Sequence, residues 1–594
     1  MQLDYRNADA VFPRVSTALG ILERAGFWLS SLAVAVLGTL AVTSITLRTL
    51  TGRAITDDNI MIGDLVVAIV ALSWAIVTAT QGNILVEVFT NWVGNRGQAA
   101  LRVLASIVGL AMILPLCWAS GVMAYDAIVK MTYYDGLLHW PQWPSRSIFF
   151  VSFVMMGLRL VLLFLVLRVP IAFSLGSVAA ACTFVFYAWP QGREFDFAFG
   201  VRAVVPLLTA NSFNFVHSFE MSMVPLFIAL SHLAYHAGIT TDIYNAARIW
   251  LARLPGGLAI ASIMGCGGFS ALTGSSVACA AAMGRICTPE MLRAGYGQRL
   301  ATSSVAVGGT LGSLIPPSVP FILYGIFTEQ SIAKLFLAGI LPGLISLVAF
   351  VIVVLIWVRI NPSEAPAFEG EITHADRLRA LAGIWPALLL FGIILGGIYG
   401  GIFTTTEAAA ISAFAALVIG IMLGRLTWAS FLESMRQTAY QTATIFLIAF
   451  GAKMFVSFVA LTGVVPWSVG LIQGLEMEHW QTLFMICLIY LVLGMFLDPI
   501  GILLLTLPFV VPLVEDMGLN LIYFGVIVVK LLEIGLITPP VGLNAFIIKS
   551  VVGREVDVYT IFAGIMRFLV ADLVVLGLIV AFPIISLLIP MSMY

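Results

Sequence analysis

Apolar runs of about 20 residues recur along the whole chain, and each is long enough to cross a bilayer as a helix. The 594 residues are 61% hydrophobic and only 10% charged, whereas about 25% of the residues of soluble domains are charged. The pattern predicts an all-α polytopic membrane protein. Spanning helices are expected at 28–48, 63–81, 103–126, 147–168, 170–189, 219–237, 297–325, 335–358, 384–401, 405–424, 440–460, 519–548 and 562–589.

Two further apolar stretches, 257–288 and 480–512, are each interrupted near the middle, and we interpret them as re-entrant helical hairpins. The first interruption reads LTGSSVACAAAMG and places Gly and hydroxyl residues inside apolar sequence. A backbone group without a hydrogen-bond partner costs several kcal/mol in hydrocarbon, so such a break needs a reason. The segment 82–101 mixes charged and apolar residues, and we expect it to lie along the membrane interface.

Several other classes of protein are disfavoured. A net charge of -1 gives no indication of a nucleic-acid partner, and the six cysteines lack a C-x-x-C spacing. The N-terminal residues have no apolar signal-peptide core. An enzyme is not expected, because no G-x-S-x-G, H-E-x-x-H or paired aspartates are visible. A channel remains possible, but hairpins of opposite orientation fit alternating access better.

The Lys and Arg distribution favours a cytoplasmic N-terminus, and the two halves of the chain then resemble each other. Pro316-Pro317 matches Pro539-Pro540 at an offset of 223 residues. The same offset carries Ser275-Ser276 onto Asp498-Pro499 and Pro289 onto Pro512. With the predicted spans, the first hairpin opens from the cytoplasm and the second from outside. The sequence therefore predicts inverted repeats, a recurring design of secondary transporters.

Four helix breaks in two equivalent pairs mark the candidate site: the hairpin tips 273–276 and 497–501, and the crossing breaks 308–318 and 535–542. In inverted-repeat transporters, unwound carbonyls at such breaks coordinate the coupling ion. Carbonyl, hydroxyl and carboxylate oxygens suit Na⁺, or a proton-coupled variant, and not a transition metal. The candidate Na⁺ residues are Thr273, Gly274, Ser275, Ser276, Gly309, Gly312, Pro316, Ser318, Asp498, Thr538, Pro539 and Gly542.

The half-helix N-termini that follow the two tips are expected to face an anionic substrate. The candidate substrate residues are Ser275, Ser276, Asp498, Pro499 and Asn544. Other interpretations stay open: a Gly-Ser-Ser break or a Pro-Pro pair can be a simple bend, and Asp498 can be a helix N-cap. Lys530 and Glu533 stand three apart on one helix face, either as a structural charge pair or in a substrate or gating role.

These motifs are similar to those of a known family. Six segments resemble the large M subunit of TRAP (tripartite ATP-independent periplasmic) transporters. Five of them are FSALTGSSVACAAAMG, LGSLIPPSVPFILYG, GIFTTTEAAAISAF, GMFLDPIGILLLTLPFVVP and EIGLITPPVGLNAF, and the sixth, RVPIAFSLG, resembles the N-terminal signature of that subunit. The match covers roughly 150–594. Residues 20–168 resemble the small four-helix Q subunit, through TQGNILVEVFTNWV and HWPQWPSRSIFFVSFVMMG. The family hairpin often begins with Ser, where this chain has Thr273.

The resemblance implies a fused QM protein of the bacterial inner membrane, acting by an elevator mechanism with no covalent cofactor. It implies Na⁺-driven import of an organic acid, such as a C4-dicarboxylate, a keto acid or a sugar acid, delivered by a periplasmic binding protein. A monomeric QM unit is expected. The alternative is an anion/Na⁺ symporter of a related inverted-repeat family that needs no binding protein.

The expected division of the chain follows from this resemblance and from length. Between residues 145 and 189 there is room for two spans of about 20 residues but not for three. We therefore expect 147–168 to be one helix shared by the Q-like and M-like parts. The alternative is that the Q-like part lacks its last helix and 147–168 belongs to the M-like part alone. The predicted parts are 1–146 (Q-like), 147–168 (shared helix), 169–358 (first repeat), 359–383 (cytoplasmic linker) and 384–594 (second repeat).

Overall fold

The computed structural model describes residues 13–79, 113–163, 171–190, 194–366, 372–474 and 477–592. Over these residues the regular elements are helices, and the extended pairing consists of a single bridge between Tyr133 and Pro141. Eight described helices are long and apolar enough to cross a membrane, or up to ten if each of two bent pairs is one span. The prediction of an all-α polytopic membrane protein is confirmed.

The chain divides into two compact units. Unit 1 comprises 1–229 and 432–471, and unit 2 comprises 230–431 and 472–594. These units follow packing and not the order of the sequence, so they cut across the predicted repeats. The candidate site residues all lie in unit 2.

Unit 1 collects the Q-like region and the beginning of the M-like region. Its helix α2 packs against both α1 and α4. The helices are α1 (Pro13–Thr51), α2 (Asp58–Ala79), the helix Ile113–Val129, α4 (Trp143–Leu163), α5 (Ile171–Ala188), α6 (Phe197–Val216), most of α19 (Trp428–Thr462) and most of α20 (Val464–Gly474).

A buried aromatic cluster joins these helices around α4. The ring of Phe149 lies 5.8 Å from Trp74 of α2 and 5.3 Å from Phe213 of α6, measured between centroids. Phe153 lies 5.4 Å from Trp74 and 5.6 Å from Phe450 of α19. Helix α4 therefore contacts both Q-like and M-like residues, as a shared helix should, although the domain boundaries themselves stay a prediction.

Asp64 provides a second link between the same two regions. Its carboxylate accepts a hydrogen bond from the Trp140 indole N–H (2.8 Å) and lies 3.0 Å from Nε2 of His217. From its sequence surroundings Asp64 is an isolated intramembrane charge. The structure supplies partners that lie 76 and 153 residues away along the chain.

Helix α6 was not expected. Its 20 residues include Arg202 and Pro206, which lower the apolar character of the segment and hide it from a search for apolar runs. It packs against α5. Because the predicted orientation depends on counting every span, the cytoplasmic N-terminus stays a prediction. The expected interfacial segment 82–101 lies outside the described residues.

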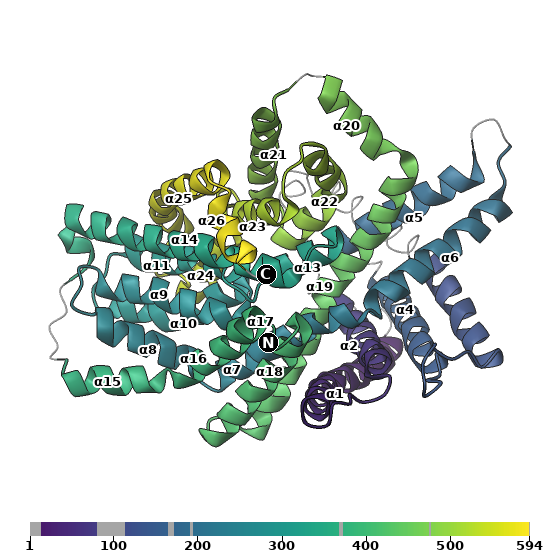
Figure 1. The fold of residues 1–594 in the computed structure, drawn as a ribbon, viewed down its shortest axis with the longest axis horizontal. Coiled ribbons are helices and arrows are strands. Elements are labelled where there is room, and N and C mark those ends of the chain that lie inside the picture. The colour runs from purple at the N-terminus through teal and green to yellow at the C-terminus, as the bar shows by residue number, and fades with distance from the viewer. Residues whose placement is uncertain are drawn as a thin grey trace. The chain divides into compact units, whose positions relative to one another are not determined.

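The first half of unit 2 contains a helical hairpin, a broken helix and a long helix. The hairpin is α9 (Gly257–Thr273) with α10 (Ser276–Arg293). The broken helix consists of α11 (Gln298–Gly308), α12 (Leu311–Leu314) and α13 (Val319–Thr328), followed by α14 (Ile332–Ile360). Figure 1 shows α9, α10 and α11 side by side, in agreement with their contacts.

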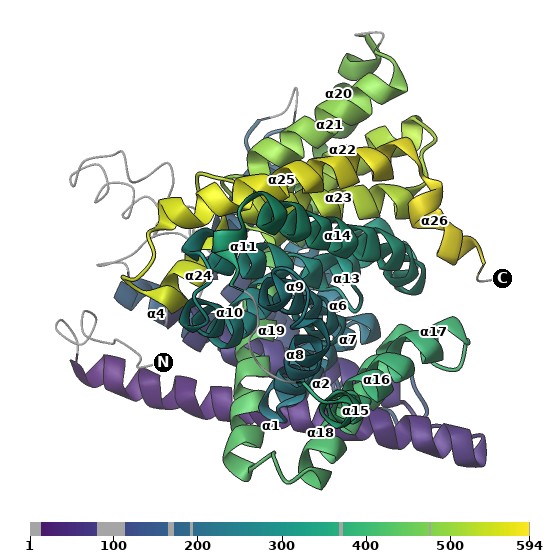
Figure 2. The same ribbon diagram turned by 90° about the vertical axis from the view of Figure 1, so that its left-hand side faces the viewer.

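The second half repeats this order. The hairpin is α21 (His479–Gly494) with α22 (Pro499–Asp516), the broken helix is α23 (Leu521–Ile537) with α24 (Leu543–Val552), and α25 (Val558–Ala581) is the long helix. Figure 2 shows α21, α22 and α25 next to α23, in agreement with their contacts. Both predicted hairpins and both predicted crossing breaks are present as interruptions between helices.

The remaining helices of unit 2 differ in detail from the predicted spans. The span expected at 219–237 is mostly α7 (Met223–His236), which crosses the boundary between the units and bends by 61° into the amphipathic α8 (Ile239–Leu251). The expected linker contains α15 (His374–Gly383), which packs on α8. The others are α16 (Trp385–Phe391), the π-helical turn Gly392–Gly396, α17 (Gly397–Tyr399), α18 (Thr405–Met422) and α26 (Ile584–Met591).

Candidate functional site

The tip of the first hairpin is a two-residue turn between α9 and α10. Gly274 ends α9 in the left-handed region, with φ of 62°. Only a glycine fits there, because a Cβ atom would also lie 2.4 Å from the carbonyl oxygen of Pro317. Ser275 is the N-cap of α10, and its hydroxyl accepts the N–H of Ala278 at 3.4 Å. The turn thus begins a new helix in the middle of apolar sequence.

This tip packs directly against the first crossing break. The hydroxyl of Ser276 donates to the carbonyl of Thr310 (3.1 Å) and lies 2.5 Å from the hydroxyl of Ser313. The N–H of Val319 donates to the carbonyl of Gly274 at 3.1 Å. The structure therefore places residues 274–276 against 308–318, the arrangement expected from the sequence.

Glycines make the close approach possible. A Cβ atom on Gly312 would lie 2.9 Å from the backbone of Ser275, and one on Gly309 would lie 2.8 Å from the Cβ of Ala280. Beyond the cis Pro316-Pro317 bond, Ser318 caps α13: its hydroxyl accepts from the N–H of Phe321 (3.3 Å) and donates to the carbonyl of Ser313.

The tip of the second hairpin is built on Asp498. This residue is the N-cap of α22, Pro499 occupies the first turn, and the carboxylate accepts the N–H of Gly501 at 2.9 Å. Only 6% of Asp498 is exposed. The N-cap role and a role in ion binding are compatible, because the cap uses one carboxylate oxygen, Oδ2, and the other, Oδ1, is available to a ligand.

The end of α21, just before the second tip, also meets the second crossing break. The N–H of Val541 donates to the carbonyl of Met495 at 3.4 Å. Gly494 and Gly535 touch, and a Cβ atom on Gly535 would lie 2.6 Å from the Cα of Gly494. In the break, the hydroxyl of Thr538 donates to the carbonyl of Ile534 (2.6 Å), the Pro539-Pro540 bond is cis, and Gly542 has φ of 51°.

Asn544 connects the two breaks. It is completely buried at the start of α24, and its side-chain N–H donates to the carbonyl of Ala306 at 3.1 Å. Ala306 lies in the last turn of α11, immediately before the first break. The two halves therefore meet at their broken helices.

Three buried oxygens at the site accept no hydrogen bond from the described part of the chain: Oγ1 of Thr273, Oδ1 of Asp498 and Oδ1 of Asn544. A buried polar atom without a partner is costly, so each such atom calls for an explanation. Hydroxyl, amide and carboxylate oxygens are ligands for hard cations. These oxygens can be ligands of a small hard cation, since Thr273 immediately precedes the first tip and Asp498 lies in the second.

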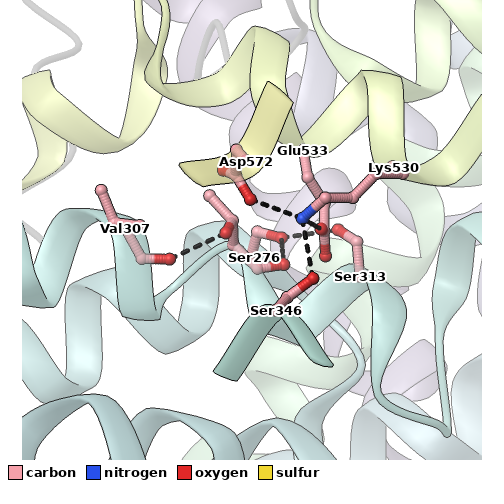
Figure 3. A network of polar contacts seen from close by, with 8 residues as sticks. Ser276, Val307, Ser313, Ser346, Lys530, Glu533 and Asp572 are labelled. Atoms are coloured by element: carbon pink, nitrogen blue, oxygen red, sulfur yellow. Dashed lines mark hydrogen bonds and ion pairs between the residues drawn. The ribbon is translucent and has the colours of Figure 1, made fainter. Parts of the chain in front are cut away.

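A buried charge cluster lies close to the first break (Figure 3). Nζ of Lys530 lies 2.6 Å from Oδ1 of Asp572, 3.2 Å from Oε2 of Glu533 and 3.0 Å from Oγ of Ser346. The three charged side chains are fully buried. The structure thus pairs Lys530 with Glu533, and it adds Asp572, which the sequence analysis missed. A lone carboxylate in the apolar run 562–589 was the available signal, since intramembrane acids are functional candidates by default.

Family models match almost the whole chain. The model of the DctM component of the tripartite ATP-independent periplasmic transporter matches residues 158–585, and that of the DctQ component matches residues 28–169. The two matches overlap at 158–169, which includes the last turns of α4.

Curated TRAP permease proteins are also similar to this chain. The isethionate TRAP transporter permease protein DctMQ of Oleidesulfovibrio alaskensis is 33% identical over 66% of this chain, and the match spans 60% of that relative's length. The sialic acid TRAP transporter large permease protein SiaM of Vibrio cholerae is 31% identical over 70% of this chain and 98% of its own length. The C4-dicarboxylate large permease protein DctM of Pseudomonas aeruginosa is 33% identical over 64% of this chain and 89% of its own length.

Among solved structures, the YdaH transporter of Alcanivorax borkumensis matches with a TM-score of 0.46 and 14% identity, over 71% of this chain and 96% of that one. The family models and the relatives agree with the resemblance seen in the sequence motifs. The chain belongs to the tripartite ATP-independent periplasmic (TRAP) transporter family, and it carries the DctQ and DctM components in one polypeptide.

Proposed function

We propose that this permease imports an organic acid by Na⁺ symport, with the acid delivered by a periplasmic binding protein. One observation carries the proposal: two hairpins contact two matched helix breaks, and in each hairpin a side-chain oxygen caps the helix that follows the tip. Broken helices that meet in this way are the usual ion and substrate sites of inverted-repeat transporters.

Two Na⁺ sites are proposed, one at each pair of breaks. The first uses oxygens of Thr273, Ser275 and Ser276 together with carbonyls of 308–318. The second uses Asp498 and Thr538 with carbonyls of 535–542. The support is the buried oxygens of Thr273 and Asp498 that accept no hydrogen bond from the described residues. Na⁺ in these positions would supply positive charge that holds each tip against its break.

The substrate is proposed to bind at the N-terminal ends of α10 and α22. Each of these helix ends offers backbone N–H donors and roughly half a positive charge. Ser275, Ser276, Asp498, Pro499 and Asn544 would line the site. Three relatives are named for isethionate, sialic acid and C4-dicarboxylates, which are acids, and these names favour an acidic substrate here.

Alternating access is proposed to be an elevator motion in the bacterial inner membrane. The carrier would contain the hairpins and the broken helices, which all belong to unit 2, and the scaffold would contain the Q-like helices of unit 1. A cytoplasmic N-terminus and a monomeric QM unit belong to the same proposal.

The test is uptake by the full-length protein in liposomes, measured with a panel of radiolabelled organic acids and the binding protein that belongs to this transporter. We expect uptake only when the binding protein is outside and a Na⁺ gradient points inward. A K⁺ gradient of equal size is the control. Uptake without the binding protein would instead support the alternative symporter, and uptake that is indifferent to Na⁺ would contradict the proposed coupling.

A further inference from the structure

Arg567 is a charged residue on the outer face of a helix that is otherwise suited to the interior of a membrane. It belongs to α25, one of the helices long and apolar enough to cross a bilayer, and its side chain is exposed. The exposed residues beside it on the same helix, Met566 and Val570, are apolar. Arginine stays charged in proteins, and a charged residue within a membrane span is a functional candidate by default.

The described part of the chain supplies no counter-ion to this guanidinium. Arg567 has neither an ion pair nor a hydrogen-bond acceptor among those residues. Helical neighbours lie three or four positions away, and for Arg567 these are Ala563, Gly564, Val570 and Ala571. None of them is acidic, so the compensating negative charge has to come from a ligand.

The duplicated fold does not require a charge at this position. Arg567 lies ten residues after Asp557, the N-cap of α25, and the residue ten positions after Ser331, the N-cap of the equivalent helix α14, is Leu341. The long helix of the first repeat therefore carries an apolar residue where that of the second repeat carries an arginine. A role in the architecture common to both repeats does not explain Arg567.

The guanidinium of Arg567 lies against the ring of Trp357 in α14. Its Cζ atom is 3.8 Å from the ring centroid, and only 3% of Trp357 is exposed. A stacked guanidinium keeps its N–H donors in its own plane, where they stay available to a bidentate acceptor. The indole N–H of Trp357 also has no acceptor within the described ranges. Together the two side chains offer a positive charge and hydrogen-bond donors.

This pair of side chains lies close to one end of the membrane-spanning region. Helices α14 and α25 run antiparallel, because Ser346 and Asp572 meet at Nζ of Lys530 whereas Trp357 meets Arg567. Trp357 precedes the end of α14 by three residues, roughly 5 Å along the helix axis. The Arg567 side chain reaches back to this level from nine residues inside α25. Such snorkelling places the charge at headgroup depth, where tryptophan is also enriched.

The two helices present apolar surface from this level inward. Figure 2 shows α14 next to α25, in agreement with their contacts. The exposed side chains toward the middle of the helices are Ile352 and Ile356 on α14 and Val570 and Leu573 on α25. A cationic group at headgroup depth above such surface fits a phospholipid, whose phosphate and acyl chains have the same order.

We propose that Arg567, stacked on Trp357, binds the headgroup of an anionic phospholipid. The phosphate oxygens accept the N–H groups of Arg567 in bidentate geometry, and the acyl chains lie along the exposed apolar residues of α14 and α25. A headgroup with net negative charge is favoured over a zwitterionic one, because the cationic group of the latter already compensates its phosphate. The lipid is a ligand distinct from Na⁺, the substrate and the binding protein, so the proposal does not depend on the transport function.

Native mass spectrometry of the full-length protein in detergent tests the site. Phosphatidylglycerol is titrated against phosphatidylcholine with the same acyl chains, and the lipids retained by each protein molecule are counted. We expect the wild type to prefer phosphatidylglycerol. The variant R567Q should bind its first phosphatidylglycerol about fivefold more weakly, as expected for the loss of one basic residue at a membrane surface.

The matched control is R359Q. Arg359 is exposed near the same end of α14, but it lies two residues from Trp357 and so points to a different side of that helix. R359Q should bind phosphatidylglycerol like the wild type. An equal loss in R359Q and R567Q would show a diffuse charge effect and overturn the proposal. Unchanged binding in R567Q, equal binding of phosphatidylcholine, or displacement of the lipid by inorganic phosphate would also overturn it.

A second measurement uses the wild-type protein alone and therefore does not depend on the folding of a variant. Phosphatidylglycerol with a photoreactive headgroup is bound, activated and located by peptide mass spectrometry. We expect labels on the segments around Trp357 and Arg567, and we expect unlabelled phosphatidylglycerol in excess to prevent them. Labels confined to other segments would contradict the site.

Discussion

At the scale of single residues, Gly274 is constrained by both backbone conformation and space. Its φ of 62° is left-handed, and the Pro317 carbonyl leaves no room for a Cβ atom. A left-handed conformation alone costs a residue with a side chain roughly 1–2 kcal/mol. We expect G274A to displace the hairpin tip, lower the thermal melting temperature in detergent, and reduce uptake at least about tenfold.

The matched control is Gly577 in α25, where a Cβ atom would meet nothing within 4 Å. G577A should leave melting and uptake near wild-type values, because alanine has the higher helix propensity. Equal effects of the two substitutions would mean that the tip does not need its tight contact with the first break.

Asp498 combines a helix cap with the proposed second Na⁺ site, and two substitutions separate these roles. Asn caps a helix about as well as Asp, whereas Ala costs about 1 kcal/mol. D498N should therefore keep the melting temperature but require a higher Na⁺ concentration for half-maximal uptake, and D498A should lose both. Uptake with an unchanged Na⁺ activation curve in both variants would show that the second site is misplaced.

At the scale of elements, the hydroxyls of Ser276 and Ser313 join the first hairpin to the first break at 2.5 Å. A double-mutant cycle with S276A, S313A and the double variant measures this link. We expect a coupling of about 1 kcal/mol in stability, as for a typical buried hydrogen bond. S412A is a useful control, because the buried Ser412 hydroxyl bonds to Ala408 and Ala409 within its own helix. A cycle that closes with purely additive effects would contradict the link.

At the scale of the whole molecule, α4 is the element that decides whether the Q-like and M-like parts form one folding unit. Phe149 is completely buried between Trp74, Phe213 and Phe450. F149A should destabilise the protein by about 3–5 kcal/mol, and a shared helix predicts a single melting transition shifted to lower temperature. Val151, 46% exposed on the same helix, provides the control V151A. Two separate transitions in F149A would argue that α4 belongs to only one part.

The sequence by itself determined the membrane class, the two hairpins, the two crossing breaks and the family. These features depend on local properties: apolar length fixes a span, and Gly, Ser and Pro-Pro pairs interrupt a helix wherever they occur in it. Tertiary structure alone decided which side chains meet. It brought Ser276 to Ser313, Asn544 to Ala306, and Lys530 to Asp572, whose partners lie 37, 238 and 42 residues away. It also revealed α6, which packs on α5. This helix contains Arg202 and Pro206, so its sequence does not form an apolar run that predicts a span. The physical reason is that a polar group buried in apolar surroundings is costly unless it is hydrogen-bonded. A lone polar residue in an apolar run therefore indicates that a partner exists, but only the packing of distant helices determines which residue that partner is.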